Sequence, residues 1–233
     1  MKYIFKKKLV KGLIKSRPNR FIMNVLISGV IEKCHCPSTG KIGDVKFENV
    51  ACLVSRAENP ERKTKFTVEA FSLDRGKNWI GINQTRANEY VEFFLRTEQL
   101  KDIFKGVDEI KREAKLGKSR IDFLINNRDY LEVKTPLNML LIKGREDHSK
   151  LTSFERLIKH FHDLSSGNGR IVLLMCYMYD AFEFKVPKPS KSEERIVRAA
   201  KKARSKGLEN WQINLKIDET GVELLNYFKL NLF

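Results

Sequence analysis

The sequence predicts an α+β fold, in which a small N-terminal β-barrel precedes an α/β domain built on a mixed sheet. In the first 80 residues, short runs of β-branched and aromatic residues alternate with turn-forming clusters, as in small barrels and sandwiches. Near residue 87 the apolar residues change to helical spacing. Residues 170–178 are apolar without alternation, which is typical of a strand covered on both faces. We therefore expect two domains, 1–82 and 83–233.

Five strand-like runs make up the predicted barrel: LVKGLIK, RFIMNVLI, VIEKCHC, FENVACLVS and KFTVEAFSL. The segments SRPN, PSTGKIGD and ENPERK between them are rich in residues that favour turn dihedral angles. Repeated short strands at this spacing make an OB-like barrel the natural candidate. Aromatic residues such as Phe21 and Phe66 would stack on bases in a single-strand-binding barrel; their alternation favours a place in the core instead.

The second domain begins with a predicted helix over about 87–97, because Val91, Phe94 and Leu95 lie at helical spacing. Three strand-like runs follow: EIKREAKL, SRIDFLIN and DYLEVKT. A turn-prone segment around Asn127 separates the last two. The order so far is therefore one helix and three strands.

The rest of the chain adds two predicted helices and two predicted strands. Thr152 and Glu155 form a capping box within the first helix signal, and the apolar strand over 170–178 follows it. A basic helix over about 192–206 is closed by Gly207. The run WQINLKI alternates apolar and polar residues and predicts a further strand.

The chain is strongly basic, with 45 Lys and Arg against 29 Asp and Glu and a formal net charge of +16. Residues 1–80 carry 17 basic and 7 acidic residues, a net charge of +10, so most of the excess lies in the predicted barrel. A positive field of this kind attracts phosphate backbones. The alternative is a lysine-rich surface that serves solubility or heat resistance.

Other features of the sequence exclude several protein classes. No run approaches the roughly 20 apolar residues of a membrane span, and lysines interrupt the opening segment where a signal peptide would be apolar. Four cysteines in 233 residues argue against a disulfide scaffold. We therefore expect a cytoplasmic protein with no membrane partner.

A candidate site arises from Asp122, Glu132 and Lys134. Residues two apart in a strand share a face, so Glu132 and Lys134 project together. If the loop before the last of the three strands is odd-numbered and centred on Asn127, paired residue numbers sum to 254, and Asp122 lies opposite Glu132. An even-numbered loop would shift the register and separate the two acids.

Two carboxylates at one place repel each other unless a cation lies between them. Mg²⁺ prefers such oxygen ligands and usually keeps several waters, one of which could attack a phosphodiester. Lys134 could position or deprotonate that water, or stabilise the transition state. The alternative is a solvated strand face that carries an ordinary ion pair, since E-x-K is common in so charged a chain.

The order helix, three strands, helix and apolar strand is that of the PD-(D/E)xK nuclease superfamily. Moreover, the chain resembles the sugar fermentation stimulation protein (SfsA) family over about residues 9–135. The residues that carry the resemblance are Gly12-Leu13-Ile14-Lys15, Arg20-Phe21, His35-Cys36-Pro37-Ser38-Thr39-Gly40, Ser55, Asn59-Pro60, Arg62-Lys63-Thr64, Glu69, Gly81, Asn83, Asn88, Ser119-Arg120, Asp122-Phe123-Leu124 and Glu132-Val133-Lys134.

This resemblance implies an OB-like barrel joined to a PD-(D/E)xK nuclease-like domain, with DNA as the partner. It implies that Asp122 and Glu132 hold Mg²⁺ or Mn²⁺, with Lys134 as the third signature residue. Glu92 on the first helix and Glu113 on the first strand are implied as supporting acids. Nothing in the sequence resembles a sugar-transforming site, so no small sugar substrate is expected.

The sequence also departs from the family. Ser38 replaces an asparagine, and Thr135 stands where the family usually has another. The segment 146–150, Glu-Asp-His-Ser-Lys, stands where the family has Pro-Asp and Thr-x-Arg-Gly. If those residues contact substrate, this chain binds DNA without cutting it, or cuts a different structure.

Nucleic-acid contacts are expected mainly from basic residues that flank the barrel strands, and binding through them would follow the phosphate backbone with little sequence preference. The turn Pro37-Ser38-Thr39-Gly40 could hold a phosphate through backbone N–H groups and hydroxyls. The predicted DNA-binding residues are Lys15, Arg17, Arg20, Ser38, Thr39, Arg56, Arg62, Lys63 and Arg120.

Two alternatives remain open. Cys34, His35, Cys36 and Cys52 suggest zinc, although successive strand residues point to opposite faces and no C-x-x-C motif accompanies them. At the level of function, the alternative to a nuclease is a non-catalytic DNA-binding regulator of sugar metabolism that keeps the nuclease-like fold. No helix-turn-helix motif is recognisable for such a role.

Overall fold

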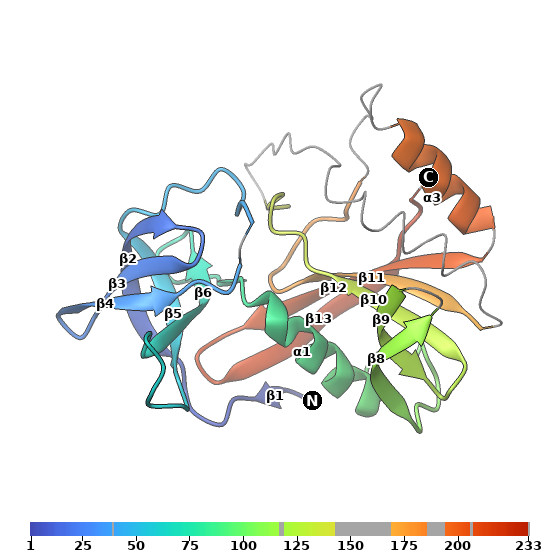
Figure 1. Ribbon diagram of the computed structural model, residues 1–233, viewed down its shortest axis with the longest axis horizontal. Coiled ribbons are helices and arrows are strands. Elements are labelled where there is room, and N and C mark those ends of the chain that lie inside the picture. Colours follow the sequence, from blue (N-terminus) through green and yellow to red (C-terminus); the bar gives the residue numbers. More distant parts are fainter. Residues whose placement is uncertain (39, 117–118, 143–168, 186–193, 206, 233) are drawn as a thin grey trace.

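The computed structural model describes residues 1–38, 40–116, 119–142, 169–185, 194–205 and 207–232. Two units lie side by side: a β-barrel and a larger curled sheet with one long helix across it (Figure 1). The OB-like barrel and the mixed sheet that the sequence predicted are both confirmed. In the described part of the chain no helix is both long enough and apolar enough to span a membrane.

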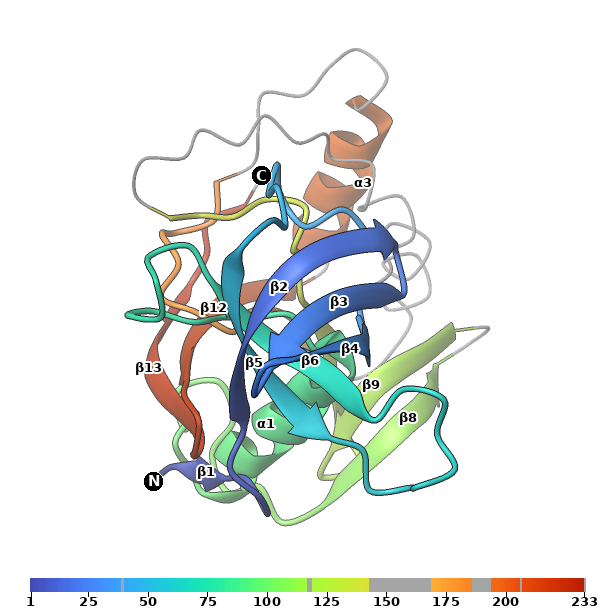
Figure 2. The ribbon, with the colours of Figure 1, turned by 90° about the vertical axis from the view of Figure 1, so that its left-hand side faces the viewer.

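The barrel consists of the five predicted strands and one short strand that the sequence did not predict. Its strand order is β4-β3-β2-β5-β6-β7, and parallel pairing of Cys34 with Phe66 joins β4 to β6 and closes the barrel (Figure 2). The strands are β2 (Val10–Asn19), β3 (Ile22–Ile27), β4 (Val30–His35), β5 (Val50–Arg56), β6 (Phe66–Ser72) and β7 (Ile80–Gly81).

The alternation in these strands determines which side chains enter the barrel. In β3, Met23, Val25 and Ile27 are buried while the residues between them are partly exposed, as the two-residue period of a strand requires. Phe66 packs against this core, whereas Phe21 is 45% exposed. The expectation that both aromatic side chains belong to the core is therefore correct for Phe66 and wrong for Phe21.

The second unit is a seven-stranded sheet in the order β1-β13-β12-β11-β10-β9-β8. Strands β10, β11 and β12 are parallel and the other pairs are antiparallel. Every residue of β11 is buried, as its unbroken apolar run predicted. The strands are β1 (Tyr3–Ile4), β8 (Ile110–Leu116), β9 (Ser119–Ile125), β10 (Asp129–Lys134), β11 (Ile171–Tyr177), β12 (Leu208–Ile217) and β13 (Gly221–Lys229).

Helix α1 (Gln84–Arg96) covers one face of this sheet (Figure 1). It begins three residues before the predicted start at residue 87. Its buried stripe includes Tyr90, Val91 and Phe94, which pack in one cluster with apolar residues of β9 to β12. A stripe at this spacing holds a helix against a sheet by burial of apolar surface.

Helix α3 (Glu194–Ser205) lies within the predicted range 192–206 and is strongly basic. Gly207 follows it with a φ of 92°, a left-handed conformation that favours glycine after a helix. The helix predicted around Thr152 and Glu155 lies outside the described residues, as does the departing segment 146–150.

Three short or amphipathic strands were not predicted: β1, β7 and β13. Strand β1 pairs with β13, Tyr3 opposite Val222, and so lies in the second sheet and not in the barrel. Strand β7 connects the units from the barrel side, because the Gly81 backbone N donates to the Met178 carbonyl at 2.9 Å. The domain boundary at residue 82 stays a prediction.

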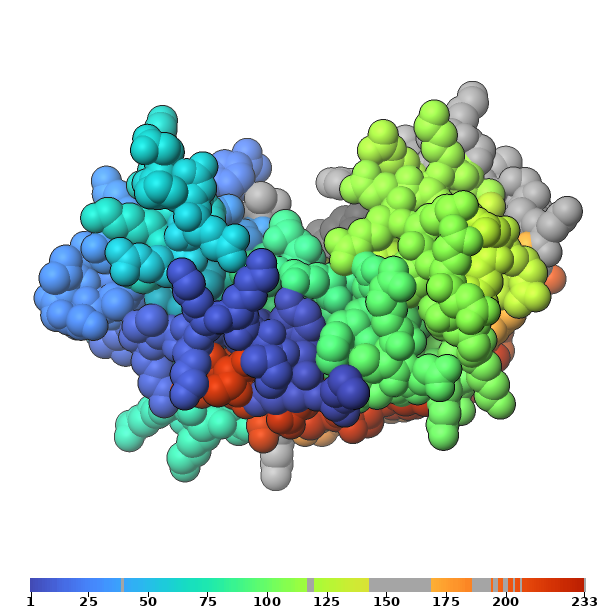
Figure 3. All heavy atoms as spheres, turned by 90° about the horizontal axis from the view of Figure 1, so that it is seen from below, coloured from blue at the N-terminus to red at the C-terminus, as the bar shows by residue number. Residues whose placement is uncertain are grey.

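Seen from below, the molecular surface is hollowed between the barrel, in cyan, and the β8–β9 hairpin, in yellow-green (Figure 3). Atoms of α1, in green, lie at the base of this hollow. The helix therefore bridges the two units, and any ligand that enters the hollow meets residues of both.

Candidate functional site

The β9–β10 hairpin carries Asp122 and Glu132, and its register decides whether they meet. Asp129 pairs with Ile125, and Leu131 pairs with Phe123, so paired residue numbers sum to 254. The loop consists of Asn126, Asn127 and Arg128, and its two asparagines have positive φ values of 50° and 54°, which asparagine tolerates better than most residues. The odd-numbered loop centred on Asn127 is confirmed, and the even-numbered alternative is wrong.

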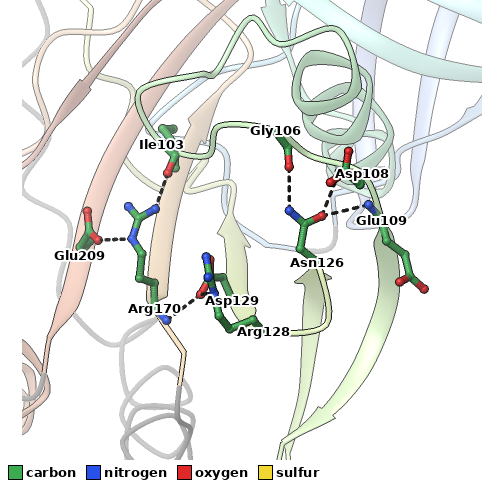
Figure 4. A network of polar contacts seen from close by, with 9 residues as sticks. All are labelled: Ile103, Gly106, Asp108, Glu109, Asn126, Arg128, Asp129, Arg170 and Glu209. Carbon is green, nitrogen blue, oxygen red and sulfur yellow. Dashed lines mark hydrogen bonds and ion pairs between the residues drawn. The ribbon is translucent and has the colours of Figure 1, made fainter.

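A polar network holds this turn in place (Figure 4). The Asn126 Oδ1 accepts hydrogen bonds from the backbone N of Asp108 at 2.9 Å and of Glu109 at 3.0 Å, and its Nδ2 donates to the Gly106 carbonyl at 2.7 Å. One side chain thus satisfies three backbone groups of the segment that leads into β8. The hairpin cannot slip by one residue without losing all three bonds.

A second part of the network anchors β10 to β11 and β12. The buried Asp129 accepts from the Arg170 backbone N at 3.0 Å. The Arg170 side chain donates to Glu209 Oε1 and to the Ile103 carbonyl, both at 2.8 Å (Figure 4). These bonds fix β10, β11 and β12 to one another where the three strands begin. The other end of β10, which carries Glu132 and Lys134, therefore extends from a fixed part of the sheet.

The candidate site lies where β9 and β10 separate. The Asp122 backbone N donates to Glu132 Oε2 at 3.3 Å, and the Val133 backbone N donates to Asp122 Oδ2 at 2.7 Å. Lys134 Nζ forms an ion pair with Glu132 Oε1. Each carboxylate therefore reaches across to the other strand, and the two acids and the ammonium group lie together.

The environment of Asp122 disfavours its negative charge. Burial raises the pKa of its carboxyl group, and the neighbouring Glu132 carboxylate raises it further. Hydrogen bonds from Val133 and Asn88 and the charge of Lys134 oppose this rise without overcoming it. Glu132 is only 4% exposed. Two acids with a single ammonium between them leave excess negative charge in a buried place.

The residues present fit a hard divalent cation. Each carboxylate oxygen has two lone pairs, and each of the two oxygens of Asp122 accepts one recorded hydrogen bond. Carboxylate oxygens are the ligands that Mg²⁺ prefers, usually with several waters and few protein groups. A cation beside Asp122 and Glu132 would also remove the repulsion that raises the Asp122 pKa.

Sequence reasoning did not assign a contact to Asn88 or Gln84, and both lie beside the site. The Asn88 Nδ2 on α1 donates to Asp122 Oδ1 at 2.8 Å, and the Gln84 Nε2 donates to the Thr135 carbonyl at 2.6 Å. The two side chains are four residues apart, on one side of the helix. That polar spacing next to the buried stripe is the signal that could have identified them.

The predicted supporting acids are engaged by arginines. Glu92 pairs with Arg96 at 2.8 Å and with Arg112 at 2.5 Å. Burial raises the pKa of Glu92, but hydrogen bonds from these two arginines hold it below its usual value. Glu113 pairs with Arg120 at 2.9 Å, with 71% and 69% of the two side chains exposed. Among the described contacts of Asp122, no hydrogen bond to Glu92 or Glu113 is recorded.

Several predicted DNA-binding residues of the barrel have contacts within the protein. Lys15 Nζ donates to Asn49 Oδ1. Arg17 donates to the carbonyls of Ser38 at 2.9 Å, Gly40 at 3.1 Å and Arg20 at 3.2 Å. This guanidinium therefore holds the turn after β4 in shape.

The other predicted contact residues differ in how far they reach solvent. Ser38 is buried, with 1% exposure, and Thr39 lies outside the described residues. Arg20 stacks over the ring of Phe21 at 4.8 Å, on the exposed side of the barrel. Lys63 is exposed. These residues stay predictions as contacts to DNA.

Arg56 and Arg62 lie together at a cavity of about 340 Å³. The cavity is formed where the barrel meets the start of α1. Both arginines are exposed at its mouth. No prediction from the sequence placed a cavity here.

The cysteines do not form a zinc site in the described part of the chain. Cys34 and Cys36 are buried on one side of the strand, and His35 lies between them on the other. Burial raises the pKa values of Cys34 and Cys52 to about 12, so these side chains are thiols in the metal-free protein. Among the described residues, no group of three or more His, Cys, Asp or Glu is arranged to hold a metal.

Comparison with known proteins identifies two matching family models. Residues 16–82 match the SfsA N-terminal OB domain, and residues 85–221 match the sugar fermentation stimulation protein RE domain. A sugar fermentation stimulation protein homolog of Microcystis aeruginosa is 30% identical over 235 residues, covering 96% of this chain and 95% of the relative. A homolog of Clostridium beijerinckii is 29% identical, covering 94% and 96%.

The fold is also that of a solved structure, Pyrococcus furiosus SfsA in complex with Ca²⁺. The TM-score is 0.77 at 21% sequence identity, and the match covers 100% of this chain and 99% of that one.

Proposed function

Because the chain belongs to the sugar fermentation stimulation protein family, we propose that it binds DNA and cleaves phosphodiester bonds in a Mg²⁺-dependent reaction. The observation that carries the proposal is the pairing of Asp122 with Glu132 across β9 and β10, with Lys134 beside them. Two acids and an amine at one end of a hairpin are the groups that metal-dependent phosphodiester hydrolysis requires.

Asp122 and Glu132 would hold the ion, which when bound supplies positive charge for the phosphate and a water of lowered pKa. Lys134 projects from the same face as Glu132 and can stabilise charge on a phosphate oxygen. The Asn88 side chain donates a hydrogen bond to Asp122 Oδ1. The orientation of the Asp122 carboxylate therefore does not depend on the ion. In support, the Pyrococcus furiosus SfsA structure contains Ca²⁺, another cation that prefers oxygen ligands.

DNA binding is supported by the charge and by the kind of barrel. Residues 1–80 carry a net charge of +10, and OB-fold barrels commonly bind single strands through basic grooves. Contacts of this kind are to the backbone, so we propose binding with little sequence preference. The hollow between barrel and β8–β9 hairpin (Figure 3) gives a strand access to both units.

The test is cleavage of plasmid, single-stranded and branched DNA in Mg²⁺ or Mn²⁺, with EDTA as a blank. We expect Asp122→Asn, Glu132→Gln and Lys134→Ala each to lower the rate by at least about 100-fold. Glu223→Gln removes an acid of the same sheet that lies on β13 and pairs with Lys2, and it should leave the rate unchanged. Cleavage that survives in the Asp122 and Glu132 variants would refute the site.

The alternative, a non-catalytic DNA-binding regulator of sugar metabolism, makes a different prediction. Backbone-directed binding should weaken steeply with salt, with a logarithmic slope of about 0.7–0.9 per phosphate contacted. A regulator should instead retain a preference for one DNA sequence at every salt concentration. Competition between random and genomic fragments across a salt titration distinguishes the two functions, whatever the outcome of the cleavage assay.

A further inference from the structure

The cavity of about 340 Å³ lies outside the carboxylate pair and has its own charged lining. Its walls come from the ends of β4, β5 and β6, the loop before β6, and the first turn of α1. The volume is within the range of sites that take small ligands or a single nucleotide. The groups that decide its chemistry are His35, Arg56, Arg62, Glu69, Thr85 and Arg86.

Glu69 forms the buried base of the cavity, with 1% exposure. Its Oε1 accepts a hydrogen bond from Ser55 and lies 3.8 Å from Arg86 Nε, while its Oε2 accepts from Asn83 Nδ2 at 2.7 Å. A buried carboxylate needs such partners. Glu69 therefore holds Arg86 at the cavity, and its charge offsets part of the positive charge of that guanidinium.

Basic side chains exceed acidic ones at the mouth. Arg56 and Arg62 line it, and for neither guanidinium is an ion pair recorded among the described residues. Glu58 is the remaining acid of the lining and is exposed. Two arginines without carboxylate partners beside a third that is anchored on Glu69 make the cavity attractive to an anion.

The start of α1 adds to this attraction. Asn83 stands at the N-cap but makes no side-chain cap bond to the helix. Its Nδ2 is committed to Glu69, and its Oδ1 accepts from the Thr85 hydroxyl at 2.6 Å. The first turn also contains no acidic residue. The positive end of the helix dipole therefore lies at the cavity without a side-chain cap, and the Glu69 carboxylate, which is bonded to Asn83, offsets part of its charge.

His35 adds a further polar group to the lining. Its Nδ1 is buried and has no hydrogen-bond partner in the described structure, an arrangement that is unfavourable unless a ligand or water completes it. Burial and the positive charge of Arg62 lower the pKa of His35, so the ring is neutral near pH 7. A neutral ring with hydrogen on Nδ1 donates to an anionic oxygen.

We propose that this cavity binds the phosphomonoester group of a nucleotide-sized ligand, with Arg62, Arg86 and His35 as the donors. A phosphate has three terminal oxygens pointing in different directions and a charge near −2, which matches donors that line the cavity from three separate parts of the chain. A carboxylate, with two oxygens in one plane, would leave one of these donors without a partner. The group can belong to a free nucleotide or to the end of a strand.

This inference goes beyond the proposed function, because the binding of a phosphomonoester does not depend on cleavage or on metal. Arg86 at the cavity and Asn88 at the Asp122 carboxylate are two residues apart on α1, and side chains at this spacing project from different sides of a helix. The cavity is therefore a separate site from the carboxylate pair.

The test uses one fluorescent single-stranded oligonucleotide with a 5′-phosphate, a 3′-phosphate or hydroxyls at both ends. Binding to the full chain is measured by anisotropy in EDTA, so that no metal-dependent cleavage occurs. Thermal shifts with deoxyadenosine monophosphate and with deoxyadenosine form the second arm. We expect at least one phosphorylated probe to bind about 10-fold more tightly than its hydroxyl counterpart, or the monophosphate alone to raise Tm.

The variant Arg62→Gln should abolish this discrimination, because it removes one of the three proposed donors. Arg62 is exposed, so the substitution does not disturb the core. Lys65→Gln makes the same charge change on an exposed residue of the same loop that does not line the cavity, and should keep the discrimination. A preference for phosphorylated strands without an effect of the monophosphate identifies a strand end as the source. A Tm rise with the monophosphate alone identifies a free nucleotide.

Equal affinity for all three oligonucleotides, together with equal thermal shifts for the monophosphate and the nucleoside, would overturn the inference. So would discrimination that Arg62→Gln and Lys65→Gln weaken alike, because it would then reflect net charge. Neither result bears on cleavage, so the two proposals fail separately.

Discussion

At the scale of single residues, the Asp122 carboxyl lies in an environment that favours its neutral form. Burial and the Glu132 carboxylate raise its pKa, so the folded state at neutral pH carries a cost that the unfolded chain does not. In the absence of a ligand this arrangement destabilises the folded state. In the proposed metal site the same repulsion would increase the affinity for a cation.

Asp122→Asn should therefore leave the metal-free protein as stable as the parent, or raise its Tm by up to about 3 °C. The Asn88 amide can rotate to accept from the new amide, while Val133 still donates to the remaining oxygen. In contrast, the Tm rise of about 3 °C or more expected from Mg²⁺ at ten times its Kd should disappear in the variant. Calorimetry with and without Mg²⁺ measures both effects.

Two results would contradict this prediction. One is a loss of several degrees in the metal-free Asp122→Asn protein, which would mean that the carboxylate stabilises the fold. The other is an unchanged Mg²⁺ response in the variant, which would place the cation elsewhere.

At the scale of elements, β12 shows how polar residues of a strand can be buried. Its apolar residues Ile213 and Leu215 are buried as expected, but Gln212 and Asn214 are also buried, with 0% and 1% exposure. Gln212 accepts from the Phe184 backbone N at 2.8 Å and donates to the Phe182 carbonyl at 2.9 Å. The side-chain amides of Gln212 and Asn214 thus bind backbone groups of the segment 181–184, which follows β11. These backbone groups would otherwise need partners from a neighbouring strand.

Replacement of Gln212 by methionine keeps the volume but removes these hydrogen bonds. Because it removes the hydrogen bonds that Gln212 makes to the Phe184 N–H and the Phe182 carbonyl, we expect a loss of about 2–4 kcal/mol in the free energy of unfolding. Lys216→Gln, at an exposed position of the same strand, should change it by less than about 0.5 kcal/mol. Urea denaturation compares the two variants, and equal losses would show that the amide bonds are unimportant.

The turn between β12 and β13 gives an element whose stability depends on pH. Burial alone would raise the pKa of Asp218. An ion pair with Lys2 and hydrogen bonds from Thr220 and the Gly221 backbone outweigh this effect and lower the pKa of Asp218 to about 2. A folded pKa below the unfolded value of about 3.9 stabilises the protein above pH 4, and the effect is lost as the pH falls from about 4 to 2.

Asp218→Asn should accordingly lower the free energy of unfolding by about 1–2 kcal/mol at pH 6, after allowance for solvent screening. The difference between variant and parent should shrink steadily in urea titrations at pH 4, 3.5 and 3. A difference that stays constant over this range would mean that the aspartate acts by shape and not by charge.

The sequence predicted the features that depend on local interactions, and it did not predict those that depend on contacts between distant segments. The hairpin register depends on loop length and on a two-residue period, so the sequence predicted the pairing of Asp122 with Glu132 for an odd-numbered loop centred on Asn127, and only the structure decided between this loop and an even-numbered one. The contact of Asn88 with Asp122 depends on how α1 packs on the sheet, which no local pattern encodes. Likewise, β12 was correctly predicted as a strand, but the burial of Gln212 depends on a distant segment that covers it.

At the scale of the whole molecule, Gly81 joins the barrel to the sheet by close approach. A Cβ at this position would lie 2.5 Å from Met178 Cβ and 3.2 Å from the Met178 carbonyl oxygen. Because both are near the backbone, the two units would have to move apart. The Gly81–Met178 hydrogen bond of 2.9 Å would be strained by the same movement.

Gly81→Ala should lower the free energy of unfolding by about 1–3 kcal/mol and separate the melting of the two units into two transitions. Gly40→Ala is the matched control, because no atom lies within 4 Å of its added Cβ. Differential scanning calorimetry distinguishes them. A single transition at the parent temperature in Gly81→Ala would show that the connection is not tight.

The antiparallel contact of Tyr3 with Val222 has a consequence for biosynthesis. During translation the β1 segment must wait, exposed, until nearly the entire polypeptide has left the ribosome, whereas the barrel strands can already close on themselves. Nascent chains arrested before residue 220 should therefore present an unfinished sheet margin to chaperones, next to a barrel that has already matured.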